Sequence, residues 1–265
     1  VIQAGDPTGT GSGGSTLGDF DDQFHVDLQH NRTGLLSMAK TTDDTNDSQF
    51  FVTEGPSRHL DFNHTIFGLL VEGESVRDEI SNVPVVSGRP TTDVVIQDAE
   101  VFIDEQNGVL QLSAPEGTTG STTVTVSVSD NKGGLSTRTF NVTILPDPEN
   151  GQPFLDDIPV ITTTIDTPVT HQLTAQDVEG DSIVFLDQAT IDSINDSLLP
   201  ESQIRIPVRS PASLDYTVDP STGLLTVTPS AGLSGTQRIT VAVASSTNLN
   251  INSPIDFQVV EIDIQ

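Results

Sequence analysis

The side chains best suited to chemistry are concentrated in the first 103 residues. This segment contains four of the five histidines, seven of the eleven phenylalanines and the single methionine. Cysteine is absent from the chain, which excludes disulfides, thiolate metal sites and thiol catalysis. Serine, histidine and aspartate all occur, but there is no Gly-x-Ser-x-Gly elbow and His171 is isolated in the sequence, so a hydrolase lacks support.

Four motifs follow one another in this segment: Val1–Gly11, Gly34–Ala39, Thr45–Val52 and Leu60–Gly68. Their order and spacing resemble the cyclophilin family of peptidyl-prolyl isomerases. The resemblance extends to about residue 103, and residues 93–102 look like the last strand of the family fold. It implies an eight-stranded β-barrel capped by helices, of which this chain is expected to hold the later part. A short helix is expected at 74–81, where Val76 and Ile80 lie four residues apart.

The chemistry implied by this family is rotation about a peptide bond that precedes proline. The rotational barrier of a peptide bond is about 18–20 kcal/mol, and unaided X-Pro isomerisation takes tens to hundreds of seconds. No covalent bond breaks, so neither a nucleophile nor a cofactor is required. The enzyme has to favour the twisted amide over both planar forms. An apolar pocket holds the proline ring, and a cationic donor near the nitrogen stabilises its lone pair.

The resemblance assigns catalytic roles to four residues of this sequence. Phe51 and Leu60 would form the proline pocket, with His64 at its rim. Gln3 would hydrogen-bond the substrate backbone around the proline. Taken singly, these residues have plainer interpretations. A phenylalanine in a strand is usually a core residue, a lone histidine such as His64 is more often a turn or core residue, and Gln3 is a polar strand residue. Five more are assigned to substrate binding: Val1 in the pocket wall, Ala39 and Lys40 along the substrate chain, Gln49 at a neighbouring subsite, and His59 where a tryptophan is associated with cyclosporin affinity.

Three positions depart from the family pattern. Ala4 replaces a glycine, Lys40 replaces an asparagine, and Asp47 replaces the glycine of an Asn-Gly-Ser-Gln run. Aspartate at position 47 would tolerate a left-handed backbone, which Asp and Asn visit more easily than most residues. The family's catalytic arginine and a pocket phenylalanine are expected before Val1. Lys40 and Arg58 are close in sequence to the site residues, but neither matches the position of that arginine, so the activity of this chain alone is in doubt.

The second half of the chain has the alternating pattern of half-buried strands. Residues 122–128 place valine on one face and threonine or serine on the other. Gly108–Val128 aligns without gaps on Gly223–Val243, with seven identities that include matched turn glycines. The first copy has little sequence of its own before Gly108 and is expected to be a half-module. The second copy is long enough for a complete β-sandwich.

An acidic loop in the second copy is a candidate calcium site. Asp177, Glu179 and Asp181 alternate beside Gly180, and carboxylate oxygens are ligands that Ca²⁺ prefers. The loop resembles those of cadherin-like and bacterial immunoglobulin-like repeats, although it lacks the full EF-hand pattern. The alternative is a solvated turn in an acidic protein.

Composition limits the partners and the compartment. With 38 acidic and 10 basic side chains the formal net charge is −28, so the phosphate backbone of nucleic acids would be repelled. No apolar run approaches the 18 residues of a membrane-spanning helix. Strong acidity without cysteine favours an extracytoplasmic bacterial protein: secreted, periplasmic or on the cell surface.

The sequence therefore predicts a mainly β chain. Its most favoured function is isomerisation of X-Pro bonds in secreted or surface polypeptides, with the β-modules as spacer or adhesion units. The alternatives are a non-catalytic proline-peptide-binding protein and a purely adhesive surface protein. The predicted domains are a partial cyclophilin β-barrel at 1–103, a β half-module at 104–147, a linker at 148–152, and a cadherin- or immunoglobulin-like β-sandwich at 153–265.

Overall fold

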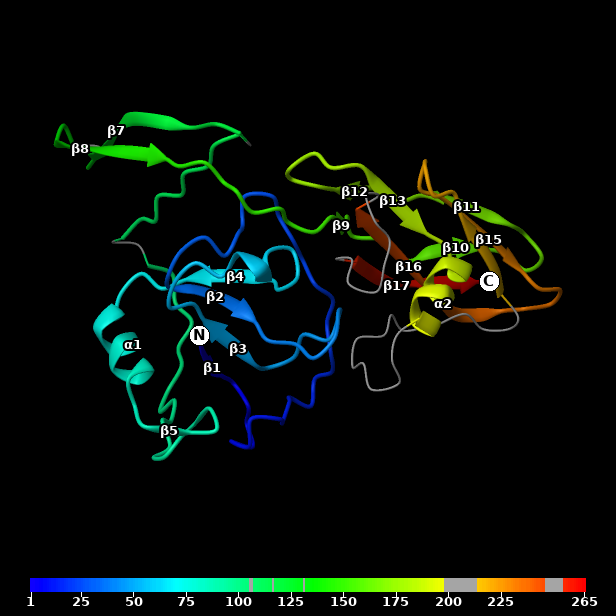
Figure 1. The fold of residues 1–265 in the computed structure, drawn as a ribbon, viewed down its shortest axis with the longest axis horizontal. Coiled ribbons are helices and arrows are strands. Elements are labelled where there is room, and N and C mark those ends of the chain that lie inside the picture. The colour runs from blue at the N-terminus through cyan, green and yellow to red at the C-terminus, as the bar shows by residue number, and fades with distance from the viewer. Residues whose placement is uncertain (105–106, 116, 131, 198–213, 246–254) are drawn as a thin grey trace. The chain divides into compact units, whose positions relative to one another are not determined.

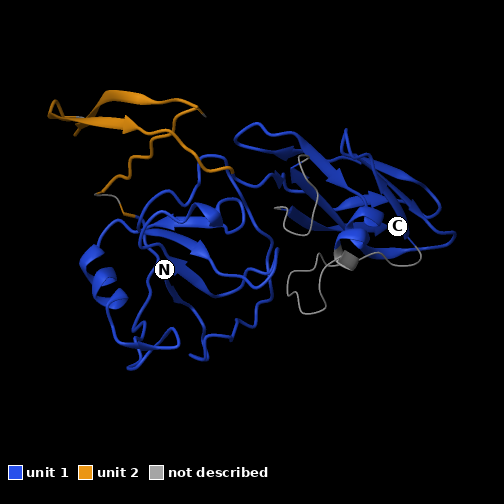
Figure 2. Cartoon of the chain, viewed as in Figure 1, with its two compact units in different colours: residues 1–103, 151–265 blue, residues 104–150 orange. Residues whose placement is uncertain are grey.

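The computed structural model shows a mainly β molecule with two short α-helices among the residues that it describes (Figure 1). It describes residues 1–104, 107–115, 117–130, 132–197, 214–245 and 255–265. Two compact units are distinguished in Figure 2: residues 104–150 form one, and residues 1–103 together with 151–265 form the other. No described helix is both long and apolar enough to cross a membrane.

An antiparallel sheet of four short strands forms the centre of residues 1–103. The strand order is β1-β3-β2-β4, so β1 and β4 are the edges and the sheet is not closed into a barrel. Leu35, Met38, Phe51 and Ile66 are its buried apolar side chains. The strands are β1 Ile2–Ala4, β2 Leu35–Met38, β3 Phe50–Val52 and β4 Ile66–Leu69.

Two helical segments and a small hairpin complete this region. The 3₁₀ helix η1 covers Arg58–Leu60, and the expected helix is confirmed as α1, Glu74–Ser81. Gly73 caps α1 at its N-terminus with a φ of 86°, a left-handed conformation that glycine adopts without strain. The hairpin pairs β5, Val85–Val86, with β6, Arg89–Pro90.

The expected last strand at 93–102 does not form. Residues 93–103 have no strand assignment, and Val101 and Ile103 are 102% and 88% exposed. A strand needs a neighbour for its backbone N–H and C=O groups. No described strand is paired with this segment, so its apolar runs at 94–96 and 101–103 produce no ladder.

Residues 104–150 contain one long hairpin. Strands β7, Gly120–Ser129, and β8, Leu135–Ile144, pair antiparallel over all ten positions, from Gly120 opposite Ile144 to Ser129 opposite Leu135. This is the alternating segment that the sequence predicted to be a strand.

The C-terminal residues form two main sheets around a shared core. The first has the order β10-β17-β16-β13, with β10 parallel to β17, and the second has the order β11-β15-β14. A short pair, β9 with β12, lies beside them. The strands are β9 Phe154–Leu155, β10 Ile161–Thr163, β11 Val169–Gln172, β12 Ala175–Gln176, β13 Ile183–Leu186, β14 Leu214–Val218, β15 Leu224–Pro229, β16 Gly235–Ser245 and β17 Ile255–Ile264.

Strand β16 is buried on both faces, which explains an element that the sequence did not predict. Ile239, Val241 and Val243 point into the core shared by the two sheets. Ala242 and Ala244 alternate with them and pack in a second cluster that contains Ile191 of helix α2, Gln188–Ser197. Small alanine side chains leave room for a helix on that face. The cadherin- or immunoglobulin-like assignment of this region stays a prediction.

Candidate active site

One face of the N-terminal sheet gathers the polar and aromatic residues of the predicted site. Gln3 on β1 and Ser37 on β2 both lie directly opposite Phe51 on β3. Residues directly opposite one another share a face of a sheet, and so do residues two apart along a strand direction. Gln49 and Ala39 are therefore expected on the same face, and the hydrogen bond between Gln3 Nε2 and Gln49 Oε1, 2.8 Å long, agrees with this.

Phe51 is held between two histidine rings. Its ring is stacked on that of His30, with centroids 6.0 Å apart, and makes an edge contact with His64 at 5.6 Å. Phe51 itself is 4% exposed. Phe50 points to the other face, where it meets Phe67 edge-on. The alternation of the strand thus assigns one of the two neighbouring phenylalanines to the site.

His64 is held in one tautomer by the sheet. Its Nδ1 is 2.9 Å from the carbonyl oxygen of Met38, which can only accept, so Nδ1 carries the hydrogen and donates. Burial lowers the pKa of His64, and the nearby Lys40 charge acts in the same direction. A neutral ring at pH 7 leaves Nε2 as an acceptor for a substrate N–H group.

The remaining predicted residues differ in how closely they join this group. The Leu60 carbonyl accepts a hydrogen bond from the His64 backbone N–H at 3.1 Å, so the end of η1 lies beside the imidazole. Leu60 is half-buried. Val1 is 59% exposed and His59 is exposed, and no described contact joins either side chain to Phe51.

A cavity of about 350 Å³ adjoins the glutamine pair. Gln49 spans it, because its Nε2 donates to the Gly13 carbonyl at 2.8 Å while its backbone carbonyl accepts from Ala39 N–H at 2.9 Å. The space is large enough for a peptide side chain. Its lining residues are Gln3, Gly11, Ser12, Gly13, Gly14, Asp19, Ala39, Lys40, Thr41, Thr45, Asp47 and Gln49.

Lys40 lines this cavity, but its ammonium group is turned inward. Nζ contacts Asp22 Oδ2 and Asp43 Oδ1, and the side chain is 4% exposed. Burial opposes the charge of Lys40, yet the carboxylates of Asp43 and Asp22 raise its pKa. The ammonium therefore neutralises an internal acidic group and is not presented to the cavity.

More carboxylates surround Lys40 than one ammonium can neutralise. Burial raises the pKa of Asp43 to about 6 and that of Asp44 to about 7. Asp22 has the opposite shift: burial opposes ionisation, but hydrogen bonds from Asp43 and Lys40 and the lysine charge lower its pKa. At neutral pH, Asp22 is therefore the ionised partner of Lys40, and Asp43 and Asp44 titrate close to neutrality.

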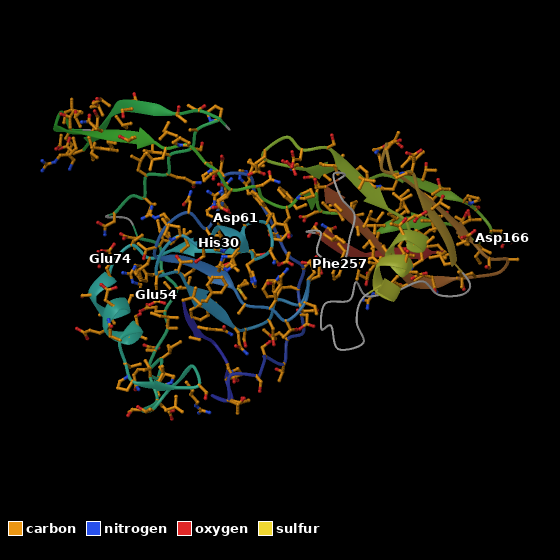
Figure 3. The ribbon with its side chains drawn as sticks, in the orientation of Figure 1. His30, Glu54, Asp61, Glu74, Asp166 and Phe257 are labelled. Carbon is orange, nitrogen blue, oxygen red and sulfur yellow. The ribbon has the colours of Figure 1, made fainter. Side chains whose placement is uncertain are left out.

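A buried serine–histidine–aspartate network lies behind Phe51 and was not predicted from the sequence. His30 Nε2 is 3.0 Å from Ser37 Oγ, and Nδ1 is 3.1 Å from Asp61 Oδ1; Figure 3 labels His30 and Asp61. The residue types are those of a hydrolase triad. However, His30 and Ser37 are both 0% exposed, and Ser37 Oγ donates to the Thr65 carbonyl at 3.1 Å. The network therefore positions the ring that stacks on Phe51 and has no access to a substrate.

Arg58 is also engaged by this network. Its Nε contacts Asp61 Oδ2, and Nη2 donates to Gln29 Oε1 at 2.9 Å. Arg58 and Lys40, the two cations named from the sequence, are thus both paired with buried aspartates.

Asp47 does not use the left-handed backbone that aspartate would tolerate at this position. Among described residues the positive φ in this loop belongs to Asp44, at 53°. Asp47 instead turns its carboxylate to accept a 2.8 Å hydrogen bond from Ser15 N–H. A Cβ atom at Gly14 would lie 1.8 Å from Asp47 Oδ2, so this contact requires a glycine at position 14.

The predicted calcium loop does not assemble a metal site. Asp177 Oδ1 accepts a 2.8 Å hydrogen bond from the Asp181 backbone N–H, which closes a turn around Gly180. Among the described residues, which include Asp177, Glu179 and Asp181, no group of three acidic or histidine side chains could hold a metal ion. Asp177, Glu179 and Asp181 are half-buried, and calcium binding at this loop stays a prediction.

Known proteins resemble the N-terminal part of the chain. A sequence model described as "Cyclophilin type peptidyl-prolyl cis-trans isomerase/CLD" matches residues 1–101. "Peptidyl-prolyl cis-trans isomerase-like 3" of Rattus norvegicus is 43% identical over 105 residues, which cover 38% of this chain and 65% of that protein. "Peptidylprolyl isomerase domain and WD repeat-containing protein 1" of Homo sapiens is 47% identical over 104 residues, or 38% of this chain and 16% of that protein.

A solved structure, a cyclophilin type peptidyl-prolyl cis-trans isomerase from Cryptosporidium parvum, is 37% identical with a TM-score of 0.35, and the match covers 36% of this chain and 63% of that one. By the family model and the curated relatives, residues 1–101 are similar in sequence to cyclophilin-type peptidyl-prolyl cis-trans isomerase domains. The chain spans between 16% and 65% of the length of the curated relatives described above.

Proposed function

We propose that residues 1–103 bind polypeptides at X-Pro bonds and catalyse their cis–trans isomerisation. The observation that carries this proposal is the position of Phe51, held between the rings of His30 and His64 on the same sheet face as Gln3 and Gln49. An apolar ring beside fixed amide groups suits a substrate that is apolar at proline and polar along its backbone.

Each group has a role in this scheme. Phe51 and Leu60 contact the proline ring, and Val1 and His59 are assigned to the outer wall. Gln3 donates to or accepts from the backbone around the proline, with its amide oriented by Gln49. A neutral His64 accepts at Nε2 without adding a charge to the pocket.

The chemistry also explains why no bond-making group is needed. The catalyst has to hold the proline ring while the preceding carbonyl rotates, and it has to bind the twisted amide more tightly than either planar form. Ala39 and Lys40 would pair through their backbone with the substrate chain and keep its ends in place. Rotation is then confined to one bond.

A non-catalytic binding function is the second candidate, and one observation favours it. Isomerisation is accelerated when a cation stabilises the lone pair of the twisted nitrogen. Lys40 and Arg58 are each engaged with buried aspartates. The pocket could then hold proline without lowering the rotational barrier.

Exchange NMR on a short Ala-Pro-containing peptide separates the two candidates. Catalysis predicts exchange cross-peaks between the cis and trans forms at substoichiometric protein, lost in Phe51→Ala. The matched control is Phe67→Ala, because Phe67 is on β4 of the same sheet and is 53% exposed. Peptide-induced shift changes at Gln3 and His64 without exchange would establish binding alone. Absence of both, in protein shown to be folded by circular dichroism, would overturn the proposal.

We also propose that the chain acts outside the cytoplasm, with residues 104–265 as spacer or adhesion units. A net charge of −28 and the absence of cysteine support this location. Immunodetection in the culture medium and surface fraction of the source cells tests it, and exclusive recovery with cytosolic markers would contradict it.

A further inference from the structure

The β7–β8 hairpin presents one apolar face and one polar face. Directly paired residues share a face, so the apolar face is made of five rows from one end of the hairpin to the other. The polar face is satisfied internally: Ser121 bonds Thr143, Thr123 bonds Asn141, and Thr125 bonds Thr139, all at 2.9–3.1 Å. The five apolar-face rows are Gly120–Ile144, Thr122–Val142, Val124–Phe140, Val126–Arg138 and Val128–Ser136.

The apolar face is only partly covered, although its valines, Phe140 and Ile144 are residues typical of a core. Val128 is 68% and Phe140 39% exposed, and Val124 and Val126 are half-buried. A two-stranded hairpin alone is marginally stable in water and usually needs further strands or a packed face. An apolar sheet face without a cover is therefore an expected interaction surface.

The same hairpin occurs a second time in the chain, where its face is covered. Strand β16 repeats β7 at an offset of 115, and β17 repeats β8 at an offset of 120, in the same pairing register. The six apolar-face positions are at most 2% exposed in the second copy. They are Ile239, Val241, Val243, Val260, Ile262 and Ile264, which correspond to Val124, Val126, Val128, Phe140, Val142 and Ile144.

The second copy shows what kind of surface fits this face. Its core is completed by residues of the opposite sheet, among them Tyr216, Leu225 and Val227. In residues 104–150, as far as the structure describes them, β7 and β8 are the assigned strands, and Leu110, the counterpart of Leu225, is 51% exposed. The missing cover is thus the apolar face of another β-sheet.

We propose that the apolar face of the β7–β8 hairpin is a self-association surface, occupied by the same face of a second copy of this chain. Each hairpin would then cover the apolar face of the other, as the β11-β15-β14 sheet covers the apolar face of β16–β17. Sheets that pack face to face lie about 10 Å apart, and a two-fold contact between identical patches is the commonest form of closed association.

The charge distribution favours a copy of this chain as the occupant. The chain has 38 acidic residues, but β7 and β8 contain none, so two hairpins meet without carboxylate repulsion. Arg138 is the charged side chain of the apolar face in these two fully described strands. A two-fold axis through the central row, Val124–Phe140, places the two Arg138 residues on opposite sides of it. They are then two rows, or about 14 Å, apart, beyond the Debye length of about 8 Å at physiological salt.

Sedimentation velocity of the whole chain over a range of concentrations tests the proposal. The protein is expected to reach twice the mass of one chain as its concentration rises. Val124→Asp, at the position directly opposite Phe140, should raise the dimer dissociation constant by at least about tenfold, because it buries an unpaired carboxylate in the contact. Thr125→Asp is the matched control: it adds the same charge one residue away, on the polar face, and should change the constant less than about twofold.

Three outcomes would overturn the proposal. The first is a sedimenting mass of one chain at all protein concentrations up to about 1 mM. The second is an equal increase of the dimer dissociation constant in both aspartate variants, which would indicate pairing through strand edges. The third is a dimer whose dissociation constant neither aspartate variant changes. Thiol labelling provides a second readout that does not depend on the folding of Val124→Asp. Because the chain has no cysteine, Val126→Cys and Thr125→Cys each introduce a single thiol. The labelling rate should fall with rising protein concentration at position 126 and stay constant at position 125.

Discussion

The two repeated hairpins of this molecule share their apolar positions and pairing register but differ strongly in burial. In β16–β17 the alternating apolar positions are at most 2% exposed, and in β7–β8 the corresponding side chains are half-buried or exposed. Both hairpins have ten paired positions or more and the same register. Alternation thus determines the strand and the direction of its side chains, and the rest of the chain determines whether a face becomes a core.

The largest difference is expected when a carboxylate is placed at matched positions. Ile239→Asp would bury an unpaired charge at a side chain with 0% exposure, at a cost of at least about 3 kcal/mol, a large part of a domain's stability. Val124→Asp should change the unfolding free energy by less than about 1 kcal/mol. Urea unfolding followed by fluorescence of Tyr216, the single tyrosine of a chain without tryptophan, reports on residues 151–265, and hydrogen exchange measured by region reports on β7–β8. Equal losses would mean that the two faces are equally buried in solution.

Removal of apolar volume should give a smaller difference with the same sign. Ile239→Ala is expected to cost about 3 kcal/mol, because it leaves a cavity in a close-packed core. Val124→Ala, at the equivalent half-buried position, should cost less than about 1 kcal/mol. Calorimetry of the two variants measures both. A cost of about 3 kcal/mol at Val124 would point to a cover over the hairpin even in the single chain.

Acid should affect the N-terminal domain and leave the β7–β8 hairpin unchanged. The folded-state pKa values of Asp43 and Asp44, about 6 and 7, lie above the ordinary value of 3.8. The folded protein therefore binds these protons more tightly than the unfolded chain, and stability falls as the pH rises from about 4 to 7. The melting temperature of residues 1–103 should be a few degrees higher at pH 5.5 than at pH 7.5.

A control for this pH effect is Asp44→Asn. Asparagine keeps an acceptor for the Asp22 N–H and tolerates the φ of 53°. The variant should be more stable than the parent at pH 7.5 and should show a weaker pH dependence. Self-association through β7–β8, which contain no carboxylate, should be constant over the same range. Hydrogen exchange measured by region at both pH values separates the two effects.

The smallest expected difference concerns one exposed cross-strand pair. Arg238 on β16 binds Glu261 on β17, with Nη2 and Oε1 2.5 Å apart and both side chains more than one third exposed. The equivalent pair in β7–β8 is Thr123 with Asn141, joined by a 2.9 Å hydrogen bond. Arg238→Gln and Thr123→Val should each cost about 0.5 kcal/mol or less. Urea titration measures the free energy of unfolding of both variants. A decrease of more than about 1.5 kcal/mol in either variant would contradict the expectation that both exposed pairs contribute little to stability.

Much of the fold could be predicted from local patterns. The strand around residues 122–128 and the helix at 74–81 follow from periodicity, and the repeat follows from matched glycines. Helix α2 could not be predicted in this way, because it depends on the alanines of β16 some fifty residues later. The strand expected at 93–102 fails for a related reason: strand formation requires a partner, and resemblance to a family strand does not supply one.

The site shows the same limit. The structure places Gln3, Gln49, Phe51 and His64 near one another, since these lie on or beside paired strands, and their roles in binding and catalysis stay predictions. Motif spacing did not predict that Lys40 turns inward, because that depends on aspartates placed around it by the folded loop. The His30–Ser37–Asp61 network was equally out of reach, as its members are separated by 7 to 31 positions along the chain.

The inward turn of Lys40 has a practical consequence for chemical labelling. The chain has two lysines, Lys40 and Lys132. Because the side chain of Lys40 is 4% exposed and its amine is engaged by two aspartates, acylating reagents should reach it slowly. Lys132 is exposed in the turn between β7 and β8. An amine-reactive dye, biotin tag or surface linker at mildly alkaline pH should therefore attach chiefly at Lys132 and at the N-terminus, which gives the hairpin tip a handle without any mutation.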